Sequence, residues 1–312
     1  MLKSPRVSIV MPVYNGEQFI GEAVRSALAS TLTDIELLVV DDGSTDASVA
    51  EATRAAAGDV RVRILSVPHG GVAAARNAAL AAARGELIAN LDADDVMFPD
   101  RLARQVAFLD AHRQYVAVGV RLVITDATGR PIRVHGRAFS HEAIDEELLS
   151  GNAGAIANAG AMFRRSSALQ IGGYAAHLTT TGEDHDLWLR LAEVGRLANL
   201  PGVLMRYRVH ESNVSVGAEK AERRLPITLD TLARAFARRG ITDRVPEKRP
   251  PRAAKLFERW TDEALLAHYR GERASAVARA LVAVALNPFS PAARAALATV
   301  LFRRSSSFAP ER

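Results

Sequence analysis

The chain has 312 residues, of which 48% are hydrophobic and 24% charged, a balance that excludes a mainly disordered protein. It contains no cysteine, which excludes disulfides, thiolate metal sites, iron–sulfur clusters and cysteine nucleophiles. No segment reaches the ~18 consecutive apolar residues of a membrane span, and the apolar run after Pro5 is short and lacks a cleavage site. We therefore expect a cytoplasmic protein without a secretory signal.

The net charge of +5 is unevenly distributed along the chain. Residues 218–312 contain 19 Lys and Arg against 10 Asp and Glu, whereas residues 1–217 contain 21 against 25. We predict two parts that divide after residue 217, the second of them basic. A basic part suits an anionic partner such as lipid headgroups, and it is at least as typical of a solvated Arg-rich helical face. Nucleic acid is not expected, because few aromatic residues accompany the charge.

Strand and helix patterns alternate through the first hundred residues. Four runs of apolar and branched residues predict buried strands at residues 7–11, 35–40, 60–65 and 87–91. Four segments with helical periodicity predict helices at residues 17–30, 46–56, 71–83 and 99–112. Continuous apolar strands separated by helices favour a mainly parallel sheet that is covered on both faces.

Polar clusters follow three of these strands, at residues 12–16, 41–46 and 92–95. Ligands of open α/β sheets bind at the carboxyl ends of the strands. We therefore expect the three clusters to line one crevice.

The rest of the chain is less regular. We expect strands at residues 116–125 and 203–209, helices at 140–149 and 183–192, and a Gly- and Ala-rich loop at 151–160. Beyond residue 218 only helical patterns occur, and residues 264–302 predict a helical hairpin that turns at Asn287.

Asp92 and Asp94 directly follow an apolar strand and are candidates for a metal site. Two carboxylates at one strand end can face the same point, where a cation relieves their repulsion. Hard ions such as Mg²⁺ or Mn²⁺ take oxygen ligands and bridge to phosphates. The alternative is a solvated turn, in which Asp95 caps the next segment and Asp100 pairs with a nearby arginine.

Asp41 and Arg76 are candidates for contacts with a nucleotide. Asp41 follows Val40 directly, where a carboxylate would face the crevice and could accept a hydrogen bond from a base. The alternative for this motif is a turn and helix cap. Gly70 and Gly71 precede the helix that contains Arg76, whose guanidinium suits a pyrophosphate or a base. The alternative here is ordinary loop-to-helix geometry.

Eight short motifs occur in an order and spacing that resemble the family-2 inverting glycosyltransferases of the GT-A fold. They are VMPVYN at 10–15, VDDGSTD at 40–46, GVAAARN at 71–77, LDADD at 91–95 with PDR at 99–101, MFRR at 162–165, IGGY at 171–174, EDHDLWLR at 183–190 and YRVH at 207–210. The resemblance covers roughly residues 6–215. It implies an α/β fold of the GT-A type, Rossmann-like with a mainly parallel sheet flanked by helices, for a catalytic domain at residues 1–217. A basic helical C-terminal segment follows at 218–312.

The family binds a nucleotide-activated sugar together with a divalent cation, so the resemblance implies roles for the matching residues. The nucleotide-sugar site would be formed by Pro12, Val13, Tyr14, Asn15, Asp41, Gly43, Arg76, Asp92 and Ala93. Asp94 would ligate Mg²⁺ or Mn²⁺, with Asp92 and His210 beside it. The general base would be Asp184, with Glu183 as the second choice.

The implied chemistry needs no protein nucleophile. A cation neutralises the diphosphate as it leaves, and a carboxylate accepts the proton of the attacking hydroxyl. One displacement inverts the anomeric centre, which suits a chain without cysteine.

The resemblance further implies a UDP-sugar donor and a glycan or glycolipid acceptor in bacterial surface polysaccharide synthesis. The basic segment 218–312 would bind the acceptor, the inner face of a membrane or a second subunit, so peripheral membrane contact and a homo-oligomer both stay open. The family commonly has asparagine where this chain has His69.

Two alternatives to a glycosyltransferase stay open. A non-catalytic nucleotide- or glycan-binding subunit could keep the fold, although intact Asp94 and Asp184 argue against it. A nucleotidyltransferase also uses paired carboxylates, but it would carry a Gly-rich basic signature near the first strand. Here that loop is Pro-Val-Tyr-Asn-Gly, and no basic residue follows until Arg25.

Overall fold

The computed structural model describes residues 4–210, 218–250 and 253–302. It contains a nine-stranded sheet. The strands are β1 (Val7–Val13), β2 (Ile35–Asp41), β3 (Val62–Ser66), β4 (Leu87–Asn90), β5 (Val96–Met97), β6 (Tyr115–Thr125), β7 (Pro131–His135), β8 (Met162–Arg164) and β9 (Arg196–Arg208). They are hydrogen-bonded in the order β3-β2-β1-β4-β8-β6-β9-β5, and β7 pairs with β6.

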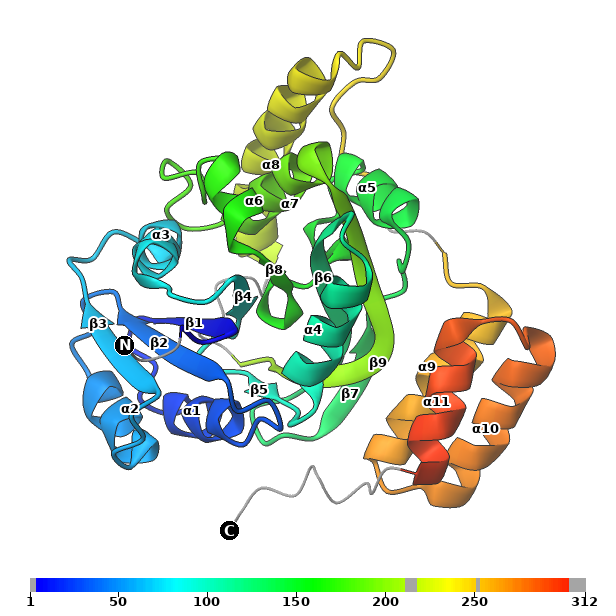
Figure 1. Ribbon diagram of the computed structural model, residues 1–312. Helices are drawn as coiled ribbons and strands as arrows, with labels where there is room; N and C mark the ends of the chain where they lie inside the picture. The colour runs from blue at the N-terminus through cyan, green and yellow to red at the C-terminus, as the bar shows by residue number, and fades with distance from the viewer. Residues whose placement is uncertain (1–3, 211–217, 251–252, 303–312) are drawn as a thin grey trace.

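Helices cover both faces of this sheet, and a separate bundle lies beside it (Figure 1). The helices are α1 (Ile20–Leu28), α2 (Ser48–Ala56), α3 (Val72–Ala82), α4 (Arg101–Ala111), α5 (His141–Leu149), α6 (Arg165–Gln170), α7 (Glu183–Val194), α8 (Ala218–Arg239), α9 (Leu256–Tyr269), α10 (Arg273–Leu286) and α11 (Pro291–Phe302). Two short 3₁₀ turns, Ala153–Ala155 and Asn158–Gly160, interrupt the loop expected at 151–160.

The first half of the sheet is parallel, as the continuous apolar strands predicted. β2 pairs in parallel with β1 and β3, and β4 pairs in parallel with β1. All seven residues of β2 are buried, because α1 and α2 cover one face and α3 covers the other (Figure 1). The carboxyl ends of β1, β2 and β4 therefore lie at one edge of the sheet.

Helices α1 and α2 begin at Ile20 and Ser48, later than the predicted starts at residues 17 and 46. Side chains of the two preceding loops bond to each other's backbone instead. Asp46 accepts from the Glu17 N–H at 3.0 Å, and Glu17 accepts from the Ala47 N–H at 2.8 Å. These bonds hold the loops after β1 and β2 together in the non-helical conformation.

The second half of the sheet is mixed, and β9 is longer than the strand predicted at 203–209. In the sequence, Pro201 and Gly202 indicate that a strand should end there. The strand instead continues through them, and β9 pairs in parallel with β6 on both sides of the two residues. The register shifts there, from Val120 opposite Leu200 to Arg121 opposite Val203.

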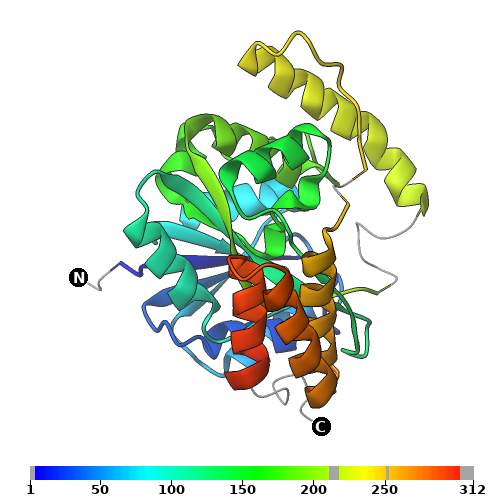
Figure 2. The ribbon, with the colours of Figure 1, turned by 90° about the vertical axis from the view of Figure 1, so that its right-hand side faces the viewer.

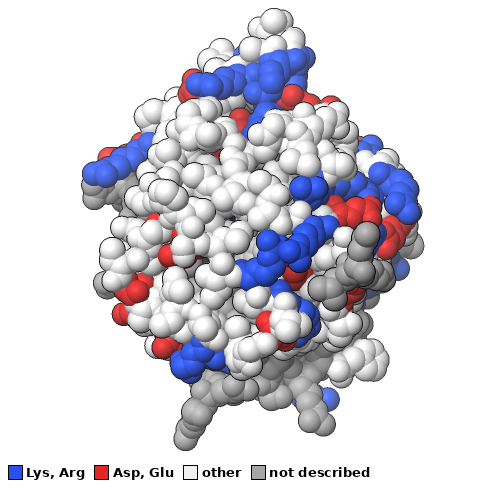
Figure 3. All heavy atoms as spheres, turned by 60° about the vertical axis from the view of Figure 1, so that its left-hand side comes forward, with Lys and Arg blue, Asp and Glu red and all other residues white. Residues whose placement is uncertain are grey.

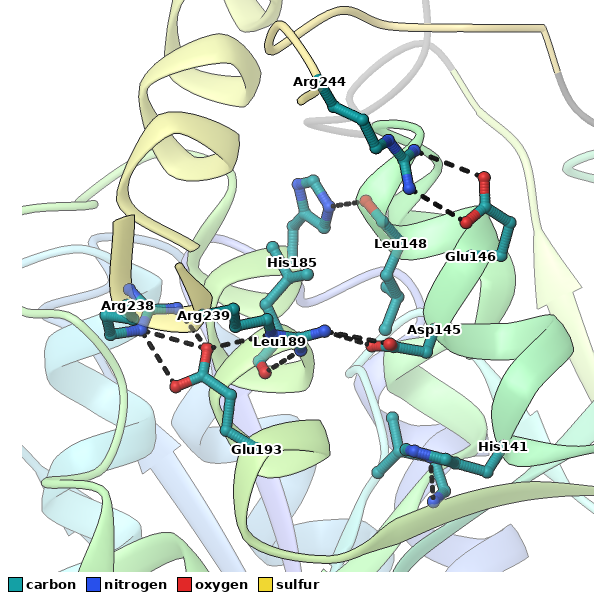
Figure 4. Close-up of polar contacts among 11 residues, drawn as sticks. His141, Asp145, Glu146, Leu148, His185, Leu189, Glu193, Arg238, Arg239 and Arg244 are labelled. Atoms are coloured by element: carbon teal, nitrogen blue, oxygen red, sulfur yellow. Dashed lines mark hydrogen bonds and ion pairs between the residues drawn. The ribbon is translucent and has the colours of Figure 1, made fainter. Parts of the chain in front are cut away.

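Helix α8 packs into the main body of the protein. Its residues Leu232, Ala235 and Phe236 share a buried cluster with Trp188 of α7. The end of the helix is tied down by ion pairs: Arg239 contacts Asp145 and Glu193, Arg238 contacts Glu193, and Arg244 in the next loop contacts Glu146 (Figure 4). The division of the chain after residue 217 stays a prediction. Helix α8 follows that division in the sequence, but it packs against residues that precede it.

Helices α9, α10 and α11 form the bundle beside the sheet (Figure 2). The predicted hairpin corresponds to α10 and α11, which meet at a turn after Leu286, but its first residues belong to α9, which starts at Leu256. Gly271, at a φ of +80°, separates α9 from α10, a conformation for which glycine is suited. α9 packs against β7 and α11 against β9, while α10 packs on the other two.

A buried ion pair joins the bundle to the sheet. Arg121 on β6 is only 1% exposed, and its guanidinium contacts Asp262 of α9. Asp262 also pairs with Arg137 at 2.6 Å, in the loop after β7. The remaining nitrogens of the Arg121 guanidinium have no hydrogen-bond partner among the described residues.

The surface has charges of both signs. On the face shown in Figure 3, Lys and Arg gather in separate clusters, several of them beside carboxylates, with broad uncharged areas between. Within the described ranges, no helix has the length and the apolar composition that are needed to cross a bilayer.

Candidate active site

A cleft of about 1840 Å³ lies along the edge where the carboxyl ends of β1, β2 and β4 meet. All three polar clusters of the first hundred residues contribute to its wall, as do the starts of α3 and α7. The cleft continues past the loop at 150–159 to β7, α8 and α9. Residues from both halves of the chain therefore line the cleft.

Asp92 and Asp94 lie in the turn after β4 and both line the cleft. Asp94 contacts His210 through its Oδ2, 2.9 Å from Nε2. Burial and the charge of Asp92 raise the pKa of Asp94. Two of the predicted metal ligands thus lie in contact, and a third, Asp92, lies two residues away.

Asp95 fixes this turn to β9 and does not cap the next helix. Its side chain is fully buried and accepts the backbone N–H of Arg208 at 2.9 Å. Burial, with the charges of Asp94 and Asp92, raises its pKa. Asp100 pairs with Arg104 at 3.5 Å, whereas Arg101 is buried and donates to the Asn90 carbonyl at 2.7 Å.

Arg76 is the centre of the site and is 4% exposed. Its guanidinium donates to Asp92 Oδ1 at 2.8 Å and also to Glu183, which arrives from α7. With its amide oxygen turned to Arg76, Asn158 accepts from both terminal nitrogens, at 2.8 and 3.2 Å. Burial lowers the pKa of Arg76, but the charges of Asp92 and Glu183 outweigh burial and raise it, so the group stays a cation.

The three carboxylates at the start of α7 have separate surroundings. Glu183 pairs with Arg76 and Asp186 with Arg190, four residues on. Asp184 lines the cleft, accepts the His185 N–H at 2.7 Å and makes no ion pair within the described part of the chain. Burial and the charge of Asp184 raise the pKa of Glu183 to about 7. Asp184 is thus the carboxylate of this set that is available to a ligand.

The glycine-rich turn before α3 is held by Asp42. Its two carboxylate oxygens accept the N–H groups of Gly70 and Gly71 at 2.8 and 2.9 Å. Gly71 has a φ of +85°, and a Cβ atom there would lie 2.2 Å from the Thr179 carbonyl oxygen. The turn therefore packs directly on the loop that leads to α7, and glycine is required at that contact.

The end of β1 and the loop after it form the other wall. Pro12 and Val13 of the strand and Tyr14 and Asn15 of the loop all line the cleft. The Tyr14 ring is half exposed and stacks on His69, with 4.3 Å between the ring centroids. Two flat rings from different loops therefore stand at the mouth of the cleft.

Asp41, Gly43 and Ala93 complete the predicted nucleotide set. Ala93 lines the cleft between the two aspartates, but Asp41 and Gly43 are not among its lining residues. Asp41 is buried and accepts the Ser44 N–H at 3.0 Å, which is the turn interaction that we considered as the alternative. The contacts of Asp41 and Gly43 with a nucleotide stay predictions, and the residues of the motif at 40–46 that line the cleft are Asp42 and Asp46.

Asp92, Asp94 and His210 suit a hard divalent cation whose remaining ligands are water or phosphate oxygens. Among the described residues, no three His, Asp or Glu side chains form a ready metal cage, so Asp92, Asp94 and His210 do not enclose an ion by themselves. Mg²⁺ is commonly held by one or two carboxylates and completes its shell with water and phosphate oxygens. Burial, and after it the charge of Asp92, raises the pKa of Asp94, and a cation bound here would favour the ionised carboxylate.

Three residues that face the site were not predicted from the sequence: Asp42, His69 and Asn158. Asp42 follows the predicted Asp41. Successive side chains of an extended chain point to opposite sides, and this alternation was the signal that only one of the two would face the cleft. His69 was noticed only as a departure from the family pattern. Nothing in the sequence around Asn158 indicated its contact with Arg76.

The sequence matches the family model "Glycosyl transferase family 2" over residues 8–172. EpsE of Bacillus subtilis strain 168, described as a glycosyltransferase, is 34% identical over 217 residues, which are 68% of this chain and 76% of EpsE. The chondroitin synthase of Pasteurella multocida strain Pm70 is 31% identical over 214 residues, 68% of this chain and 21% of that protein. The aligned part therefore spans only about a fifth of the synthase.

Solved structures share the fold at low sequence identity. Staphylococcus aureus TarS 1–349 in complex with UDP-GlcNAc has a TM-score of 0.56 at 18% identity, over 95% of this chain and 90% of that one. Mannosyltransferase PcManGT from Pyrobaculum calidifontis, in complex with GDP-Man and Mn²⁺, also has a TM-score of 0.56, at 22% identity over 98% and 83%. The predicted GT-A fold is confirmed by these similarities.

Proposed function

Because this chain belongs to glycosyl transferase family 2, we propose that it is a metal-dependent, inverting glycosyltransferase that moves a sugar from a nucleotide-sugar to a hydroxyl of a glycan or glycolipid. A UDP-sugar is the proposed donor, and bacterial surface polysaccharide is the proposed product. The complexes of similar folds with UDP-GlcNAc and with GDP-Man and Mn²⁺ support a nucleotide-sugar donor and a divalent cation.

The observation that carries this proposal is the bridge made by Arg76. One buried guanidinium contacts Asp92 on the donor side and Glu183, the neighbour of the proposed base Asp184. A leaving diphosphate bound near Asp92 and an attacking hydroxyl near Asp184 would therefore lie on opposite sides of the sugar that is transferred. This is the arrangement that a single displacement needs.

The roles of the side chains follow from their surroundings. Asp94 and Asp92 would hold the cation, which, when bound, stabilises the charge that develops on the leaving diphosphate. Asp184, free of an arginine partner in the described ranges, accepts the proton of the acceptor hydroxyl as its oxygen bonds to the anomeric carbon. The electron pair of the breaking sugar–oxygen bond passes to the diphosphate. Attack from the opposite face inverts the anomeric centre.

The acceptor is proposed to bind at the end of the cleft that lies beyond the loop at 150–159. We propose that β7, the loop after α8 and helix α9 complete it, through residues such as Arg133, Lys248 and Leu266. The acceptor would then be contacted by both parts of the chain.

The test compares Asp184→Asn with the control Asp230→Asn, which changes an exposed aspartate on α8 outside the cleft. Release of nucleoside diphosphate from UDP- and GDP-sugars is measured with Mn²⁺, with EDTA, and after Mn²⁺ is restored. We expect Asp184→Asn to lower release by at least about 100-fold, the usual contribution of a general base. UDP should still raise the melting temperature of this variant, and the control should behave as the parent.

Three results would contradict the proposal. Equal turnover in Asp184→Asn would exclude this base, and full turnover in EDTA would exclude the cation. UDP binding without any turnover by the parent, across the donors and acceptor extracts, would favour the non-catalytic binding subunit.

A further inference from the structure

Helix α10 has an outer face of apolar residues. After Arg273 in the first turn, the exposed positions of the helix recur at helical spacing and are all apolar: Ala274, Ala278, Leu281, Val282, Ala285 and Leu286. Leu281 is 53% exposed and Leu286 48%. Phe289 follows in the turn to α11 and is 84% exposed. We refer to these seven residues as the outer face of α10.

This face has no cover within the described part of the chain. The opposite side of the helix already serves the bundle, because Ala276, Ala280 and Ala283 are fully buried. Apolar residues therefore occupy two sides of α10, and only the side that faces the bundle is covered by described residues. Contiguous exposed apolar surface of this kind marks an interaction site.

The chain segment that carries the outer face has a net positive charge. Residues 273–302 contain Arg273, Arg279 and Arg294 and no Asp or Glu. Arg279 reaches Glu263 on α9 at 3.9 Å, while Arg273 and Arg294 make no ion pair among the described residues. Glu272, which precedes α10, is the exposed acidic residue next to this segment. Exposed apolar side chains on a segment whose charged residues are all arginines suit an anionic lipid surface.

The position of α10 relative to the cleft agrees with such a surface. Helix α9 lies between them: Asp262 and Leu266 line the cleft, whereas Ala264 and Ala267 belong to the cluster that packs on α10. A helix with its side chains is about 10 Å thick. A bilayer that touched the outer face would therefore be separated from the acceptor end by the thickness of α10 and α9, roughly 20 Å.

The basic charge of α8 does not form a comparable surface. Arg238 and Arg239 are paired with Glu193 and Asp145 of the body (Figure 4). Arg234 is paired with Asp230 of the same helix. The pairs of Arg238 and Arg239 hold α8 on the body, so part of the positive charge of residues 218–312 is neutralised by carboxylates of the first part of the chain.

We propose that the outer face of α10 binds the headgroup region of an anionic bilayer and so brings the acceptor end of the cleft to lipid-carried acceptors. The choice of a bilayer over a second copy of the chain rests in part on the proposed function, in which a glycolipid is an acceptor. The binding itself needs no turnover.

The experiment is sedimentation of the full chain with vesicles of phosphatidylcholine alone or mixed with phosphatidylglycerol. The double variant Leu286→Glu/Phe289→Glu removes the apolar contact, and Val60→Glu is the control, since Val60 is 94% exposed on the loop before β3. We expect the parent and the control to bind the anionic vesicles, and the double variant to bind at least about tenfold more weakly. Tenfold corresponds to about 1.4 kcal/mol.

Each other outcome counts against the proposal. Absence of the parent from anionic vesicles, or equal binding by the double variant, would overturn it. A parent that is dimeric by light scattering and a double variant that is monomeric would assign the face to a second copy. Thermal stabilisation of the double variant by UDP would show that this variant is folded. Vesicle binding and sugar transfer are measured separately, so a protein that fails to bind vesicles can still pass the test of the proposed transferase activity.

Discussion

Replacement of Arg76 by methionine tests the bridge between the two halves of the site. The side chain is 4% exposed and compensates the charges of Asp92 and Glu183. Removal of one partner from a buried ion pair costs about 3–5 kcal/mol, because the other charge stays buried. At about 2–4 °C per kcal/mol, the melting temperature should fall by roughly 6–20 °C.

The second variant, Arg76→Met/Glu183→Gln, separates charge from packing. If the uncompensated carboxylate causes the loss, the neutral glutamine should restore part of it, and the double variant should be more stable than Arg76→Met alone. The coupling should be on the order of 1–3 kcal/mol, as expected for residues in contact. Lower pH should also reduce the cost, because the pKa of Glu183 is raised to about 7 and the carboxyl can accept a proton.

The assay is chemical denaturation at pH 8.0 and pH 5.5. Arg54→Met, which breaks an exposed Arg–Glu pair on α2, is the control and should leave the midpoint unchanged. A loss below about 1 kcal/mol in Arg76→Met, or a double variant that is no more stable than Arg76→Met, would refute the reasoning.

Three further results are expected. Asp42→Ala leaves the N–H groups of Gly70 and Gly71 without their acceptor, so we expect a loss of about 2 kcal/mol in denaturation and weaker UDP binding in thermal shift; unchanged UDP binding would contradict it. Gly71→Ala places a Cβ 2.2 Å from a carbonyl oxygen and should destabilise the protein more than Gly58→Ala, which has a similar φ but open space; equal melting temperatures would contradict this. The raised pKa of Glu183 means that the folded state binds more protons than the unfolded chain between pH 4.5 and about 7. The free energy of unfolding should therefore fall as pH rises through this range, and Glu183→Gln should flatten the slope.

The parallel half of the fold could be predicted from the sequence because each strand is a continuous apolar run. β9 was only half predicted, because Pro201 and Gly202 are usual signs of a break and the sheet accommodates them by a register shift. Only the end of helix α9 was predicted, as part of the following helix, because the helical spacing of apolar residues continues from one helix to the next. In the structure the two helices are separate, with Gly271 between them.

Within the site, the motifs predicted the clusters but not the contacts between them. Arg76 and Glu183 are 107 positions apart, and no local pattern relates them. The choice between Asp41 and Asp42 depends on which of two neighbouring side chains turns toward the cleft, and this is decided by the glycine turn that Asp42 holds. The stacking of Tyr14 on His69 likewise depends on two loops that meet only in the folded chain.

The ion pair between Arg121 and Asp262 has a consequence for how the protein can be shortened. A cation inside the central sheet depends for its counter-charge on a helix near the end of the chain. A shortened protein that stopped before α9 would leave this guanidinium without its carboxylate and would also open the apolar cluster that Val123 and Val134 share with Leu265 and Tyr269. The last three helices are therefore part of what stabilises the sheet, and a truncation before them should lower the free energy of unfolding.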